Sequence, residues 1–97
     1  MKRSSSLYGR TALGRETRRI RRAPEGVRNV TLNEAAYSLG QLIESDDLPL
    51  DEVREELAVA GLHAGLDPDE VEATVTSGLE AGRRSPRPPR GRRNRGR

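Results

Sequence analysis

Apolar residues in the middle of the chain recur at the three- and four-residue spacing of an amphipathic helix. The residues with this spacing are Leu32, Ala35, Ala36, Leu39, Leu42 and Ile43. Because they fall on one side of a helix, they predict an apolar stripe that faces a core. Thr31 with Glu34 matches a capping box and predicts the start of this helix, and the Asp-Asp-Leu-Pro segment at 46–49 predicts its end.

A third helix is predicted after Pro49. Asp51 is expected to cap its start, because an aspartate side chain accepts from free backbone N–H groups there. Its inward residues are expected to be Val53, Leu57 and Ala60. Gly65 is expected to end it, because glycine adopts the left-handed conformation without a steric penalty.

A fourth helix is predicted from the Asp67-Pro68 pair. Proline is favoured at the first helical position, where its missing N–H costs nothing, and Glu70 completes a capping signal. The predicted buried side consists of Val71, Thr74, Val75, Gly78 and Leu79. Gly78 is expected to admit a close neighbour, and Gly82 is expected to end the helix.

Residues 8–22 predict a helix with arginines beside its apolar side. Leu13, Ile20 and Ala23 share one face, and Pro24 ends the helix because it lacks a backbone donor. Residues 1–7 lack periodicity and are expected to be flexible, and residues 83–97 have nothing apolar to bury and predict a disordered Arg-rich tail. The predicted fold class is all-α, a small bundle of three to four short helices over residues 8–82.

Charge along the 97 residues is segregated into three blocks. Residues 1–28 carry a net charge of +7, residues 29–82 carry −12 and residues 83–97 carry +8. The net charge of +3 for the whole chain therefore conceals a basic start, an acidic middle and a basic end. Blocks of one sign are typical of segments that contact a charged partner.

Several function classes are excluded or disfavoured by composition. The chain has no Cys, which excludes thiolate chemistry, and its single His, His63, makes a His-containing metal cluster or a Ser-His-Asp arrangement implausible. The acidic residues at 46–47 and 67–69 are explained by turns and helix caps. We therefore expect no enzyme activity, no cofactor and no metal. The absence of an apolar run or signal segment predicts a cytoplasmic protein without a membrane contact.

The arginines are the candidate functional residues, because regularly spaced guanidinium groups match the phosphates of a nucleic acid. The candidate nucleic-acid-binding residues are Arg15, Arg18, Arg19, Arg22, Arg28, Arg83, Arg84, Arg87, Arg90, Arg92 and Arg93. Neither an aromatic stacking platform nor a base-reading helix is evident, so binding to DNA is expected to be non-specific and sensitive to salt. Arg-Gly runs such as that of the tail also bind single strands.

Other interpretations of the same charges remain open. The basic helix face is either solvated or paired with the acidic middle block, and the tail either binds or only solubilises. A second hypothesis is a protein-interaction module whose basic helix docks on the acidic face of a partner or of a second copy, giving a homodimer.

Three stretches of the chain together suggest a family. Residues 28–43 (Arg-Asn-x-Thr-Leu-Asn-x-Ala-Ala-Tyr-Ser-Leu-Gly-Gln-Leu-Ile), Gly65-Leu66, and residues 74–82 (Thr-x-x-Ser-Gly-Leu-x-Ala-Gly) resemble the helical region C-terminal to the catalytic domain in actinobacterial bifunctional DNA primase/polymerases. The likeness covers about residues 8–87. Asp46 and Gly61 depart from that pattern, where the family tends to carry Gly and Ala.

The resemblance implies a small helical accessory domain in the replication of a plasmid, phage or integrated mobile element. Its partners would be DNA and replication proteins such as a primase or a helicase. The catalytic domain with its metal-binding carboxylates is not in this chain, so the resemblance implies no polymerase activity and assigns no catalytic residue.

Overall fold

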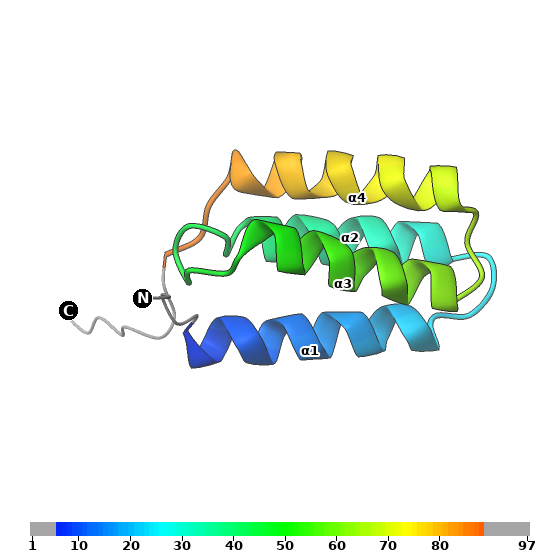
Figure 1. Cartoon of the computed structure of the whole chain (residues 1–97), viewed down its shortest axis with the longest axis horizontal. Coiled ribbons are helices and arrows are strands. Elements are labelled where there is room, and N and C mark those ends of the chain that lie inside the picture. Colours follow the sequence, from blue (N-terminus) through cyan, green and yellow to red (C-terminus); the bar gives the residue numbers. More distant parts are fainter. Residues whose placement is uncertain (1–5, 89–97) are drawn as a thin grey trace.

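Four α-helices make up most of the part of the chain that the computed structural model describes, residues 6–88. They are α1 (Leu7–Arg22), α2 (Arg28–Gly40), α3 (Leu50–His63) and α4 (Pro68–Arg83). Figure 1 shows α1 and α4 on opposite sides of the bundle, with α2 and α3 between them. The described residues contain no strand, and the predicted all-α class is confirmed.

The core lies between the four helices and is built almost entirely from aliphatic side chains. Every helix contributes to it, and the fully buried residues include Ile20, Leu32, Leu39, Leu57 and Leu79. Burial of one such side chain contributes about 1.5–3 kcal/mol to folding. The stripe predicted over residues 32–43 is buried throughout, although its last two members lie in the turn that follows α2.

The predicted capping box at Thr31 and Glu34 is wrong, because α2 begins three residues earlier, at Arg28. The backbone N–H of Val27 donates to the carbonyl oxygen of Pro24, and Gly26 has a φ of 100°, so the chain has already reversed before residue 28. Thr31 lies inside the helix, where its hydroxyl donates to the carbonyl oxygen of Val27 at 2.8 Å. The turn at 24–27 therefore determines where α2 begins.

The predicted end of α2 and the predicted cap of α3 are also displaced. The helix ends at Gly40, and turns extend from residue 41 to residue 47. Next, α3 begins at Leu50 with Pro49 at the capping position, so Asp51 lies in the first turn instead of capping it. A carboxylate there still interacts favourably with the positive end of the helix dipole.

The junction between α3 and α4 matches its prediction. Gly65 has a φ of 102° and ends α3 in the left-handed conformation. The carboxylate of Asp67 then accepts from the backbone N–H groups of Asp69 and Glu70 at 3.1 and 3.3 Å. These two local devices, with Pro68 at the first helical position, fix the reversal between the helices.

Close packing of α2 against α4 depends on glycines. A β-carbon on Gly78 would lie 2.6 Å from the β-carbon of Ala36, and one on Gly40 would lie 2.5 Å from the carbonyl oxygen of Leu79. A β-carbon on Gly82 would overlap the carbonyl oxygen of Tyr37. Gly82 therefore does not end α4, which continues to Arg83, but lets the two backbones touch.

Both ends of the described chain are fixed to the turn at 41–47. The hydroxyl of Ser6 accepts from the N–H of Gly9, capping α1, and donates to the buried carboxylate of Asp46 at 2.7 Å. At the other end, the side-chain amide of Gln41 donates to the carbonyl oxygen of Ser85 at 2.9 Å. The ordered region thus extends past the boundaries predicted at residues 8 and 82, and the remaining residues of the predicted flexible ends, 1–5 and 89–97, lie outside the described part.

We expect Gly82→Ala to lower the free energy of unfolding by about 1–3 kcal/mol, because rigid backbone must move to admit the methyl group. Gly14→Ala is the matched control, since its β-carbon would meet only the end of the Arg18 side chain at 3.6 Å. That control is expected to stabilise the protein by about 0.5–1 kcal/mol through helix preference. Urea unfolding followed by circular dichroism measures both, and equal effects would contradict the close α2–α4 contact.

Candidate functional site

Four of the candidate arginines lie together on α1. Their spacing of three, four and seven residues puts them on one side of the helix. They surround a shallow, open depression of about 540 Å³ whose other lining residues are Ala23, Pro24 and Thr31. This group is called the arginine face below, and it consists of Arg15, Arg18, Arg19 and Arg22.

Acidic neighbours divide the arginine face into paired and unpaired members. Arg19 contacts Glu16 at 3.1 Å and also pairs with Glu34 on α2. The hydrogen bond to Glu16 raises the pKa of Arg19 above its usual value, the bond to Glu34 adds to this effect, and partial burial opposes it. Arg15 lies 3.8 Å from Glu16, which is only 7% exposed. Because Glu34 belongs to α2, the ion pair between Arg19 and Glu34 stabilises the junction of α1 with α2.

Arg18 and Arg22 are the unpaired members of the arginine face. Both are exposed, and neither forms a hydrogen bond or an ion pair with any residue between 6 and 88. Their guanidinium groups point to no compensating carboxylate within the described part of the chain. With Arg15, which is half-exposed, they make a cationic edge along the last two turns of α1.

The remaining candidate arginines do not join this face. The Nε of Arg28 donates to the carbonyl oxygen of Ala23 at 3.1 Å, which occupies it at the end of α1. Arg83 pairs with Glu44 at 2.8 Å, and Figure 1 places the end of α4 at the opposite end of the bundle from the end of α1. Arg84 is exposed beside it. Arg87 is half-buried, and its Nε is buried from solvent without a hydrogen-bond partner among the described residues.

Three predicted site residues lie outside the described part of the chain: Arg90, Arg92 and Arg93. Their contribution stays a prediction.

A second depression, also of about 540 Å³, adjoins the arginine face. Arg19 lines both depressions, and the second one extends between α2 and α4. Its other lining residues are Asn33, Glu34, Tyr37, Ser38, Ser77, Gly78 and Ala81. Tyr37 is not among the site residues predicted from the sequence, although its position outside the apolar stripe of α2 already indicated an exposed ring.

Charge is distributed unevenly over the bundle. The helix α1 carries six arginines and one glutamate, whereas residues 50–83, which form α3 and α4, carry nine acidic and two basic side chains. Figure 1 places α1 and α4 on opposite sides of the bundle, so the basic helix α1 lies farthest from the acidic helix α4. A polyanion is therefore attracted to the α1 side and repelled from the α4 side.

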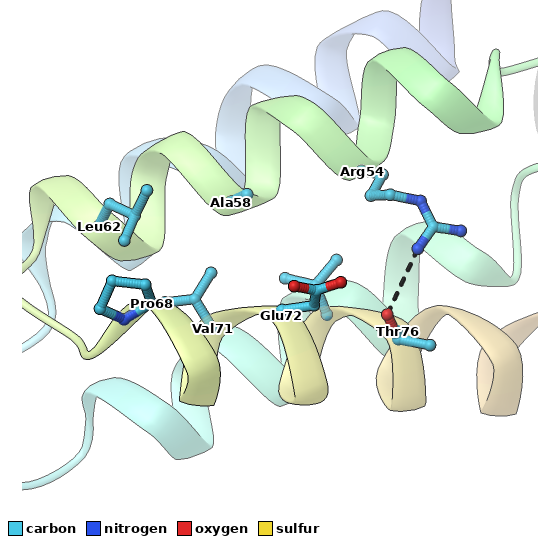
Figure 2. Close-up of a pocket in the computed structure, with 8 residues that line it drawn as sticks. Arg54, Ala58, Leu62, Pro68, Val71, Glu72 and Thr76 are labelled. Atoms are coloured by element: carbon cyan, nitrogen blue, oxygen red, sulfur yellow. Dashed lines mark hydrogen bonds between the residues drawn. The ribbon is translucent and has the colours of Figure 1, made fainter.

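An apolar groove separates α3 from α4 on the acidic side (Figure 2). It has a volume of about 290 Å³, and its apolar lining residues are Ala58, Leu62, Pro68, Val71 and Val75. At one end of it the guanidinium of Arg54 donates to the hydroxyl of Thr76 at 3.3 Å, and Glu72 lies beside that pair. No sequence pattern predicted this groove, because its lining residues come from two separate helices.

Within residues 6–88, no three His, Asp or Glu side chains converge in a way that could hold a metal ion. None of the helices in this part of the chain is long and apolar enough to span a bilayer.

Comparisons with protein-family models, with curated proteins and with solved structures find no match to this chain.

The free energy of unfolding should distinguish the paired Arg19 from the unpaired Arg18. We expect Arg19→Ala to lower the free energy of unfolding by about 1–2 kcal/mol, because it leaves the buried carboxylate of Glu16 poorly compensated. Arg18→Ala, the matched control, is expected to change it by less than about 0.5 kcal/mol. Urea unfolding at neutral pH measures both variants. A neutral Arg19→Ala would show that the pairs with Glu16 and Glu34 do not stabilise the fold.

Proposed function

We propose that this chain is a non-catalytic accessory domain that binds the phosphates of DNA through the arginine face. The observation that supports the proposal most directly is the pair of exposed arginines, Arg18 and Arg22, that no carboxylate of the described residues neutralises. Arg10 and Arg83, by contrast, are paired with acidic side chains. The unpaired ones keep their full charge for a ligand.

The dimensions of the arginine face suit a phosphate backbone. Seven residues separate Arg15 from Arg22, which corresponds to about 10 Å along the helix. A nucleic-acid strand advances about 3.4 Å per nucleotide in a B-form duplex, so the face spans about three phosphates. Binding of this kind releases counterions and carries no base specificity, because side chains of the face reach the backbone only.

The biological setting that we propose follows from the family resemblance of residues 28–43 and 74–82. The domain would act in the bacterial cytoplasm during replication of a mobile element, beside a primase or a helicase. The acidic α3–α4 side would then face away from DNA and towards such a protein, since like charges keep it from the phosphates.

We expect Arg18→Ala to weaken DNA binding and to lower the salt dependence of the affinity. Loss of one phosphate contact reduces the slope of log affinity against log salt by about 0.9 for a duplex and about 0.7 for a single strand. Arg54→Ala is the matched control, because it removes the same charge from the acidic side of the bundle. Fluorescence anisotropy between 50 and 200 mM salt tests this, and equal slopes for both variants would contradict the proposal.

A second candidate function, docking of a partner protein, is favoured by the groove between α3 and α4. Its apolar floor is flanked by helices with a net charge of −7 over residues 50–83. An amphipathic helix with one apolar face and basic flanks satisfies both features. The basic helix of a second copy does not offer such a face, because the apolar residues of α1, Ala12, Leu13 and Ile20, are buried in its own core. The occupant that fits is therefore a basic helix of another protein.

We expect a synthetic helix with leucines on one face and lysines on the other to bind this groove. Leu62→Ser should weaken that binding at least about fivefold, because Leu62 lines the groove. Val59→Ser is the matched control, since Val59 is 49% exposed, close to the 46% of Leu62, and does not line it. Titration calorimetry distinguishes the two variants, and equal weakening would exclude the groove as the docking site.

A further inference from the structure

Tyr37 lies on the outer side of α2, where it does not serve the core. It is 38% exposed, and its hydroxyl has no hydrogen-bond partner among residues 6–88. The apolar stripe of α2 passes through the neighbouring Ala36 and points the other way. An aromatic ring presented to solvent beside charged residues is the type of surface on which a nucleic-acid base stacks.

The contacts between α1 and α2 place Tyr37 beside the arginine face. Arg22 and Thr31 line the same depression, and one turn along Arg19 pairs with Glu34. Glu34 and Tyr37 lie one turn apart on α2, and both line the second depression together with Arg19. Arg19 lines the depressions on both sides, which makes the arginine face and the Tyr37 ring parts of one surface.

The backbone of Tyr37 is held firmly in place. Its carbonyl oxygen lies against Gly82, at the point where α2 and α4 approach each other most closely. The ring is therefore attached to a rigid position, and little conformational entropy is lost at the backbone when a ligand binds. Glu34, the one carboxylate in this depression, is already paired with Arg19.

We propose that this surface binds single-stranded nucleic acid, with phosphates on the arginine face and a base stacked on Tyr37. This inference rests on the proposed phosphate binding, and it adds that the preferred nucleic acid is single-stranded. Bases of a duplex are stacked on one another in its interior and cannot reach a ring on a helix surface. A single strand exposes them, so it makes both contacts, whereas a duplex makes the phosphate contact alone.

Tyrosine emission reports the stacking directly, because the chain has no Trp and its two tyrosines are Tyr8 and Tyr37. In a Tyr8→Phe variant, checked for native circular dichroism, all tyrosine emission comes from Tyr37. We expect a thymidine oligonucleotide to quench that emission and a duplex of equal length to leave it unchanged. In the reciprocal variant, Tyr37→Phe, the emission of Tyr8 should not respond to either. Quenching that is equal for strand and duplex would overturn the inference.

Affinity for three labelled ligands separates stacking from charge in the full chain. The ligands are a thymidine strand, an abasic strand with the same number of phosphates, and a duplex. We expect Tyr37→Ala to weaken binding of the thymidine strand by about 5- to 150-fold, the range for loss of one stacked base. Binding of the abasic strand should not change, and Tyr37→Phe should keep the preference for bases.

The outcomes distinguish the two proposals. Equal affinity of the native protein for the thymidine and abasic strands, with both weakened by Arg18→Ala, would overturn stacking and leave phosphate binding intact. If Arg18→Ala weakened neither, the arginine face would not be the binding surface, and both proposals would fail. A preference for bases that Tyr37→Ala abolishes supports both.

Discussion

The close contact of α2 with α4 is the constraint on which the rest of the structure depends. Gly40, Gly78 and Gly82 leave no side chain between the two backbones, so the helices approach until the carbonyl oxygen of Tyr37 meets Gly82. The core is small and consists of aliphatic side chains. Close approach of the helices gives it the dispersion energy that larger aromatic side chains supply in the cores of other domains. The same contact fixes the side of α2 that remains outside, and with it the place where α1 packs.

Ion pairs then determine what each arginine does. Arg10, Arg19 and Arg83 each bind a carboxylate on another segment of the chain, namely Glu52, Glu34 and Glu44 respectively. These pairs connect α1 to α3, α1 to α2, and α4 to the turn at 41–47. Each exposed pair contributes little to stability. The carboxylate nevertheless reduces the positive potential that the arginine would present to a ligand. Unpaired positive charge on α1 remains at Arg18 and Arg22, in the last two turns of the helix.

Much of the fold could be predicted because it follows from local rules. The spacing of Leu32, Ala35 and Leu39 predicted a buried stripe, and Gly65 and Asp67 predicted the junction of α3 with α4. The start of α2 was predicted wrongly because a capping motif at Thr31 competes with a turn at 24–27, and the turn prevails. Gly82 was predicted to end α4 because glycine often ends a helix. Its actual role, contact with the backbone of Tyr37 on α2, cannot be inferred from adjacent residues.

The sequence by itself determined that helices form, the apolar stripe that α2 buries and the segregation of charge, since each depends on neighbours within one or two turns. Only the tertiary structure decided which arginines are neutralised, because their partners lie 15 to 42 positions away in the chain. It likewise placed Tyr37 beside the arginine face and opened the groove between α3 and α4. Those features depend on how helices pack against one another, and packing is decided by the few positions where a side chain is absent.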